Sequence, residues 1–190
     1  MRDAAGSARL FIAVKIPPEL AQSLDAVIRQ LAAAGAEVKW VKTKNLHLTL
    51  KFLGEVDAAE ISPLIAALQT IKSENFDIEV GSIGVLPNMR RPRVIYADVV
   101  QGAEKLTKLA ILVEKVTVSL GFTPENRHFL AHLTLGRFKG FAHLNRLAEK
   151  IDGAKGVIFG KLSVEAIYLI KSELLPDGPR YTELAAIPLE

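Results

Sequence analysis

The sequence predicts an α+β fold made of two similar lobes, and three observations support this prediction. Apolar runs rich in β-branched residues alternate along the chain with segments of helical periodicity. The same order of elements occurs in both halves of the 190 residues. Each half also contains the tetrapeptide His-Leu-Thr-Leu once, at 47–50 and at 132–135. A duplicated, two-lobed single domain is the most economical interpretation of this pattern.

In the first half, three apolar runs with β-branched residues predict strands: 9–15, 46–53 and 76–85. Two segments between these runs predict helices that bury one apolar stripe: 17–35 and 60–72. Pro17 and Pro18 suit the first turn of the first helix, and Gly35 suits its end. Pro63 is placed in the first turn of the second helix for the same reason.

The second half repeats this order. Strands are predicted at 93–100 and 129–138, and further β-rich segments complete the sheet at 157–170 and 181–188. Helices are predicted at 103–120, where Gly121 ends the apolar stripe, and at 143–151. Each copy of His-Leu-Thr-Leu therefore falls on the second predicted strand of its half.

The composition is that of one ordinary globular domain, with 49% hydrophobic and 24% charged residues. Residues 1–8 are expected to form a flexible extension of this domain. No cysteine occurs, which excludes disulfides and thiolate chemistry and fits a cytoplasmic location. No run approaches the roughly 20 apolar residues of a membrane span, so no membrane association is expected. The net charge of +3 mildly favours an anionic partner.

Each copy of the tetrapeptide has a polar face and an apolar face, because side chains two apart on a strand point the same way. His47 and Thr49 share one face, and so do His132 and Thr134. If the two lobes face each other, the two pairs meet across a cleft. One neutral imidazole can then take a proton from water, one imidazolium can protonate a leaving oxygen, and the hydroxyls can bind phosphate oxygens. This arrangement suits phosphoryl chemistry.

A single His-x-Thr strand would be interpreted as an ordinary polar face, so the functional hypothesis depends on the two matching copies. His128 and His143 lack a following threonine and are interpreted as surface or packing residues. A metal centre is a weaker alternative, because neither motif has an Asp or Glu at ligand spacing. No metal and no cofactor are therefore expected.

Several segments besides the two motifs resemble those of a known family. They are RLFIAVKIP near the start, NLHLTLKFLGEV around the first motif, RPRVIYADV in the middle and SELLPDGPRYTEL near the end. In these segments and in its two H-x-[ST]-x motifs, the chain resembles the 2H phosphoesterases, and specifically the bacterial and archaeal RNA 2′,3′-cyclic phosphodiesterases. The resemblance covers nearly the whole chain. One departure is Ala131, where relatives often have proline before the second histidine.

The resemblance implies two antiparallel sheets that face a central cleft, with helices on the outside. It implies metal-independent hydrolysis of RNA or nucleoside 2′,3′-cyclic phosphates to 2′-phosphates. It further implies that His47 is the proton donor and His132 the proton acceptor, in one site with Thr49 and Thr134. Strand spacing alone does not assign these roles. The expected partners are RNA ends or nucleosides that carry such a cyclic phosphate, and the protein is expected to act as a monomer.

Two further residues are candidates for substrate binding. Arg137 can clamp phosphate oxygens with its planar guanidinium. Strict alternation along the strand puts it on the wrong face, so a bulge permitted by Gly136 is needed. Phe11 can stack on a nucleobase at the cleft mouth, although a core position is the favoured interpretation, and Phe52 is the same kind of case. Lys51 shares the nominal face of the first histidine.

Two other functions stay open at this point. The same acid–base groups can run in reverse and join a cyclic phosphate end to a 5′ hydroxyl, which gives a 2′,5′ linkage. A noncatalytic RNA-binding module can use the cleft for anion recognition alone, and the basic run 90–93 also fits contact with an RNA backbone. The two intact His/Thr pairs favour catalysis, since a pure binder needs no matched proton donor and acceptor.

Overall fold

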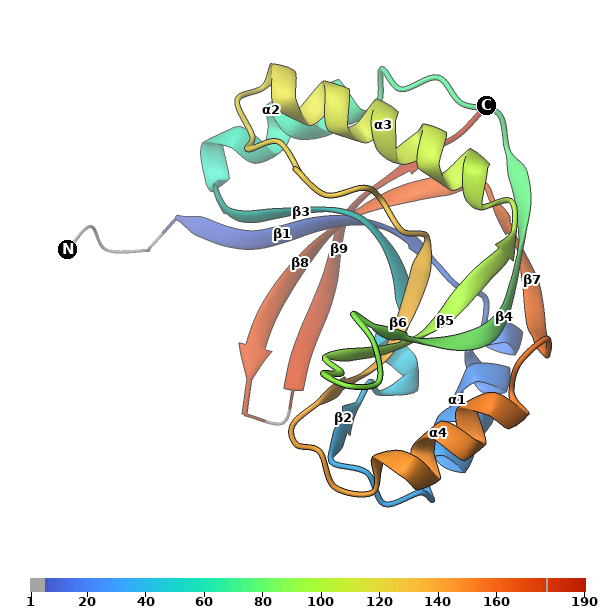
Figure 1. The fold of residues 1–190 in the computed structure, drawn as a ribbon. Helices are drawn as coiled ribbons and strands as arrows, with labels where there is room; N and C mark the ends of the chain where they lie inside the picture. The colour runs from blue at the N-terminus through green and yellow to red at the C-terminus, as the bar shows by residue number, and fades with distance from the viewer. Residues whose placement is uncertain (1–5, 177) are drawn as a thin grey trace.

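A nine-stranded antiparallel sheet forms the centre of the computed structural model, which describes residues 6–176 and 178–190 (Figure 1). The strands are β1 (Ser7–Lys15), β2 (Val38–Trp40), β3 (His47–Asp57), β4 (Phe76–Leu86), β5 (Val94–Gln101), β6 (His132–Phe138), β7 (Ile158–Val164), β8 (Ala166–Leu175) and β9 (Gly178–Pro188). The helices are α1 (Pro18–Ala32), α2 (Ala58–Leu68), α3 (Ala103–Ser119) and α4 (Leu144–Gly153), and a 3-10 turn, η1 (Thr43–Asn45), precedes β3. The predicted α+β class is confirmed.

The sheet is one hydrogen-bonded path in the order β7-β4-β5-β6-β3-β1-β8-β9, with β2 paired to β6. Its two halves are joined in the middle, where β3 and β6 pair through Leu48 and Leu133. Each half of the path mixes strands from both halves of the sequence, because β4 lies between β7 and β5, whereas β8 and β9 follow β1. The two motif strands are therefore direct neighbours in a single curled sheet.

Two pairs of helices lie on the outer side of the sheet. Figure 1 shows α2 with α3 at one end of the molecule and α1 with α4 at the other. α3 packs against β3, and α1 packs against β7. Each helix buries its apolar stripe there, which for α1 consists of Leu20, Leu24, Ile28 and Leu31. None of the described helices is long and apolar enough to cross a membrane.

β1 is buried on both of its faces. Its even-numbered apolar residues, Leu10, Ile12 and Val14, belong to the main core beneath the helices. Phe11 and Ala13 point the other way and form a second, small cluster with Ile170, against which Tyr168 and Tyr181 pack. This second cluster lies on the same face of the sheet as the first motif's histidine, because the Phe11 ring contacts the imidazole of His47.

Some predicted boundaries are wrong for local reasons. Asp57 precedes α2, and its main-chain N–H donates to the Glu60 carboxylate at 3.2 Å, so the helix begins before the predicted residue 60. Pro63 consequently lies inside the helix rather than in its first turn. β2 and η1 were too short to give a periodic signal. Of the predicted extension 1–8, residues 1–5 lie outside the described part, while Ser7 and Ala8 belong to β1.

A buried ion pair links β3 to the segment that leads into β6. The Lys51 side chain, only 4% exposed, places its ammonium 2.6 Å from the Glu114 carboxylate on α3. The same ammonium donates to the Thr123 carbonyl at 3.1 Å, and Glu114 also accepts the main-chain N–H of Glu125 at 2.9 Å. The expectation that Lys51 shares the face of His47 is wrong, because a bulge in β3 turns it into the core.

Replacing Lys51 with Met should lower the free energy of unfolding by about 2–4 kcal/mol, since it leaves the Glu114 carboxylate and the Thr123 carbonyl without their cation. The loss should be read from urea unfolding monitored by fluorescence or circular dichroism. The matched control is Lys72→Met, which removes an exposed ion pair with Glu190 and should change stability by less than about 1 kcal/mol. Equal, small losses in both variants would show that the buried pair does not hold the two segments together.

Candidate active site

The pairing of β3 with β6 gathers the four predicted His and Thr side chains on one face. Continuing the antiparallel register by one residue in each direction places His47 opposite Thr134 and Thr49 opposite His132. The paired leucines between them are fully buried in the core, so the four polar side chains project from the other face of the sheet. All four are half-buried. The two histidines and the two threonines are thus gathered on one face around the single paired position between the two strands.

Both imidazoles are held by the same hydrogen bond. Nδ1 of His47 lies 2.8 Å from the Asn45 carbonyl, and Nδ1 of His132 lies 2.8 Å from the Leu130 carbonyl. A carbonyl oxygen can only accept, so each Nδ1 carries the hydrogen and donates it. The neutral form of each ring therefore has its lone pair on Nε2. Each Nε2 can take up a proton when neutral or give one away when the ring is charged.

Aromatic rings surround the imidazole of His47. The Phe11 ring lies beneath it at a centroid distance of 4.8 Å, and the Tyr181 ring meets it edge-on at 5.3 Å. Burial by these neighbours lowers the pKa of His47, the hydrogen bond to Asn45 opposes this effect, and the positive charge of Arg137 lowers the pKa further. In the free protein, His47 thus favours its neutral form.

The predicted bulge before Arg137 is present. β5 and β6 shift register between Tyr96 opposite Thr134 and Ile95 opposite Gly136, so Leu135 is the extra residue. The guanidinium of Arg137 comes near enough for its charge to act on both rings: it adds to the lowering of the His47 pKa by burial, and it opposes burial, which raises the pKa of Tyr181. Alternation alone placed this arginine on the wrong face, and the bulge corrects that placement.

Gly136 follows the bulge for a reason that the sequence did not indicate. A Cβ at this position would lie 2.5 Å from Cγ1 of Val38 and 3.0 Å from Cε3 of Trp40. The close approach of β2, rather than an unusual backbone conformation, requires glycine here.

The first motif contains the same bulge. The register of β1 and β3 shifts between Ala13 opposite Thr49 and Ile12 opposite Lys51, which makes Leu50 the extra residue. Phe52 in the first motif therefore stands at the position of Arg137 in the second. Its ring is 60% exposed and lies 6.1 Å from that of Phe11, so its interpretation as a core residue is wrong.

Phe11 does not lie at a cleft mouth. It is only 3% exposed and is covered by the rings of His47 and Tyr181. The stacking role suggested for it is therefore wrong, and its interpretation as a core residue is confirmed. Sequence reasoning also missed two tyrosines that contact the motif histidines. Tyr181 lies against His47, and the ring of Tyr96 contacts that of His132 edge-on at 5.4 Å between centroids. Their alternation with core residues on β9 and β5 was the available signal.

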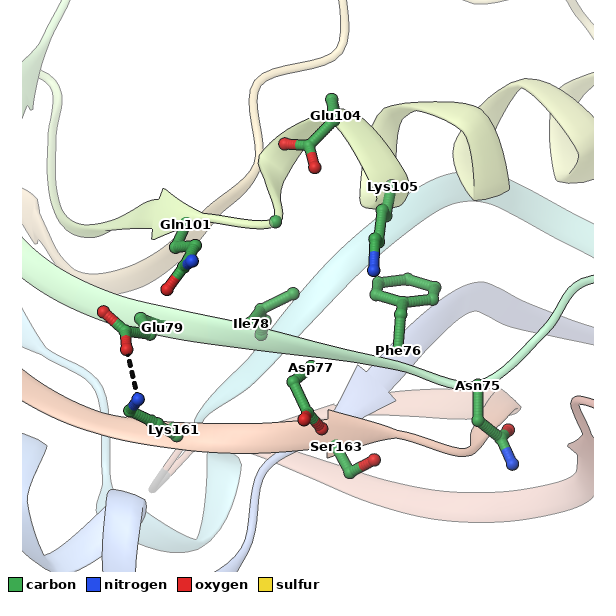
Figure 2. A pocket seen from close by; sticks show the side chains of 11 residues that line it. Asn75, Phe76, Asp77, Ile78, Glu79, Gln101, Glu104, Lys105, Lys161 and Ser163 are labelled. Atoms are coloured by element: carbon green, nitrogen blue, oxygen red, sulfur yellow. Dashed lines mark ion pairs between the residues drawn. The ribbon is translucent and has the colours of Figure 1, made fainter.

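The remaining candidates lie outside this cluster. His128 and His143 are exposed, as predicted. Within the described residues, no group of three or more His, Cys, Asp or Glu side chains can hold a metal ion. A cavity of about 600 Å³ opens between β4, β7 and the start of α3 (Figure 2). None of the predicted site residues lines it, and its Glu79 already pairs with Lys161 across the strands.

Comparison with known proteins gives a consistent result. The family model described as "LigT like Phosphoesterase" matches residues 14–96 and 98–181. An RNA 2′,3′-cyclic phosphodiesterase of Methanothermobacter thermautotrophicus is 35% identical over 183 residues, which is 95% of this chain and 98% of that protein. One from Aquifex aeolicus is 40% identical over 149 residues, or 76% of this chain and 78% of that protein.

Two crystal structures share the fold over nearly their full lengths. TT0787 of Thermus thermophilus matches with a TM-score of 0.78 and 30% identity, covering 95% of this chain and 97% of that one. Escherichia coli LigT complexed with 3′-AMP matches with a TM-score of 0.76 and 26% identity, covering 96% and 98%.

The pKa of His47 in the free protein should lie below the ordinary value of about 6.5, because burial disfavours the imidazolium. Arg137→Ala should raise this pKa by removing a nearby positive charge, whereas Arg137→Lys should leave it nearly unchanged. NMR titration of the histidine ring protons measures the pKa, and His47→Gln identifies the resonance. A value of 6.5 or more, or no response to Arg137→Ala, would contradict the observed arrangement.

Proposed function

The chain belongs to the LigT like phosphoesterase family, and on this premise we propose that it hydrolyses RNA or nucleoside 2′,3′-cyclic phosphates to 2′-phosphates. The observation that carries the proposal is the matched pair of imidazoles, each with its Nδ1 hydrogen bonded to a carbonyl and its Nε2 left for proton transfer. A site that only bound an anion would need donors but no such pair. Two opposed proton-transfer groups suit displacement at phosphorus.

In this proposal the two rings act on opposite sides of one phosphorus atom. His132 takes a proton from the attacking water at Nε2, and His47 gives a proton to the leaving O3′ of the ribose. The hydroxyls of Thr49 and Thr134 donate hydrogen bonds to the non-bridging oxygens, and the charge of Arg137 offsets the negative charge that accumulates on them. The P–O3′ bond breaks as the bond from the water oxygen forms, so the phosphate stays on O2′.

The lowered pKa of His47 is compatible with its role as the donor. A bound phosphate anion beside the imidazole favours the charged form and raises the pKa again. Burial and Arg137 continue to disfavour the charge, so the proton is held less firmly than the anion alone would hold it. A donor of this kind transfers its proton readily to a developing alkoxide.

The chemistry proposed here uses no metal ion and no cofactor. Its support is the donor set, since the described residues hold no metal-binding cluster of His and acidic side chains. Phe52 takes the stacking role that Phe11 does not fill, because its exposed ring follows the first motif on the same face. We further propose that the protein acts as a monomer in the cytoplasm.

We also propose that the two halves of the chain are a duplicated unit and that the two halves of the single curled sheet face each other across the site. Three observations support a duplication: the separate matches of the family model to each half, the four-strand halves of the sheet and the bulge that follows each threonine. β4 of the first half pairs with strands of the second half, and β8 of the second half pairs with β1 of the first, so the two units are held together by shared strands.

Replacing either motif histidine with Ala should lower kcat by about 10²–10⁴-fold, because one proton transfer is lost. The double variant should be little slower than either single variant, since the two rings act in the same step. Steady-state kinetics with uridine 2′,3′-cyclic phosphate measures both effects, and His143→Ala, at an exposed histidine outside the site, serves as the control. Full activity in His132→Ala would contradict the proposal.

The product should be a single isomer, the 2′-phosphate, because two fixed proton-transfer groups define one axis through phosphorus. Phosphorus NMR against authentic 2′- and 3′-nucleotides identifies the product from each of the four nucleoside 2′,3′-cyclic phosphates. The reaction should survive excess EDTA. A clean 3′-phosphate would reverse the acid and base assignments or the docking of the sugar. Loss of activity with EDTA and recovery with one divalent ion would favour a metal-dependent hydrolase.

A further inference from the structure

A cavity of about 280 Å³ lies beside the first motif, between η1 and the hairpin of β8 and β9. Its lining includes Lys42, Lys44, Asn45, Arg180 and Tyr181. Three of these residues are cationic, and no lining residue in the described part of the chain is acidic. Cationic side chains in a concave surface concentrate ligands of the opposite sign, so the described part of the lining favours an anionic group.

Two residues that line this cavity, Asn45 and Tyr181, also contact the imidazole of His47. The main-chain carbonyl of Asn45 accepts the Nδ1 hydrogen bond of His47. The ring of Tyr181 lines the cavity and contacts the same imidazole edge-on at 5.3 Å between centroids. A group bound in the cavity would therefore lie next to the proposed proton donor.

The walls of the cavity are fixed by contacts at several points. The Asn45 side chain, in a residue only 7% exposed, donates to the Pro179 carbonyl at 3.0 Å and ties η1 to β9. One residue before Lys44, the Thr43 hydroxyl donates to the Asp25 carboxylate on α1 at 2.5 Å. The backbone on both sides of Lys44 is thus held in place, and a preformed site loses less entropy when a ligand binds.

The cations of the cavity differ in how far they are already engaged. The Arg180 guanidinium pairs with Glu173 on the neighbouring strand at 3.0 Å, which orients it and balances part of its charge. The Lys44 ammonium has no hydrogen bond or ion pair with any residue that the structure describes. Lys44 is therefore the charge that a bound anion can use most directly.

We propose that this cavity binds the 5′-phosphate of the nucleotide that carries the cyclic phosphate. The proposal rests on the function proposed above, with His47 as the proton donor. In-line displacement puts the leaving O3′ opposite the attacking water, so the ribose lies on the His47 side. O5′ belongs to the same ribose, and its phosphate extends past His47 into the cationic cavity.

The experiment compares two substrates that differ by one group: adenosine 2′,3′-cyclic phosphate with a 5′-hydroxyl and the same compound with a 5′-phosphate. In the wild-type protein, kcat/KM should be about 10-fold or more higher for the 5′-phosphorylated compound, as expected for charge-assisted contacts. Lys44→Ala and Lys44→Ala/Arg180→Ala should bring the ratio of the two kcat/KM values towards one. The control is Lys108→Ala, which removes one exposed positive charge on α3 and should leave the ratio unchanged.

Salt gives a second readout of the same contact. The kcat/KM of the 5′-phosphorylated compound should fall more steeply with salt than that of the 5′-hydroxyl compound, and the Lys44→Ala variant should lose the difference. A wild-type ratio near one, or a ratio that survives the double variant, would overturn the subsite while the proposed hydrolysis stands. An equal drop with Lys108→Ala would overturn it in favour of long-range attraction. Hydrolysis of neither compound would overturn the proposed function and the subsite with it.

Discussion

The backbone pairing of Leu48 with Leu133 is the contact on which the rest of the site depends. It joins the two halves of the sheet through the strand at the inner edge of each half and makes the two motifs direct neighbours. Both leucines are anchored in the core, so the histidines and threonines beside them must project from the opposite face. A slip of one residue in this register would send the polar side chains into the core and the leucines into the site.

Two further constraints make this face chemically useful. The carbonyl two residues before each histidine fixes the ring tautomer, so each neutral imidazole has its hydrogen on Nδ1 and its lone pair on Nε2. The bulge after each threonine turns the next two residues so that one enters the core and the following one faces the site. In the first motif these residues are Lys51 and Phe52, and in the second they are Gly136 and Arg137. A shared backbone therefore carries an aromatic ring on one side of the site and a cation on the other.

The sequence predicted most of the elements because their periodicity is strong, and it predicted the four His and Thr residues because the motif is repeated. It did not predict that β4 pairs with strands of the second half while β8 and β9 join those of the first, since such pairing is not local. Strict alternation misplaced Lys51 and Phe52 because a bulge leaves no local signature at Leu50. Tyr181 was missed because a tyrosine on an amphipathic strand looks like any other half-buried ring until the neighbouring strand is known.

The central claim is that both imidazoles act through Nε2 on one phosphorus atom. Nitrogen-15 NMR of the histidine rings, with and without a nucleoside vanadate as a trigonal-bipyramidal analogue, tests it most directly. In the free protein at high pH, His47 and His132 should both show a protonated Nδ1 and a bare Nε2. The analogue should shift both Nε2 resonances and leave those of His128 and His143 in place. A response from only one of the two motif histidines, or a neutral tautomer with the hydrogen on Nε2, would contradict the account.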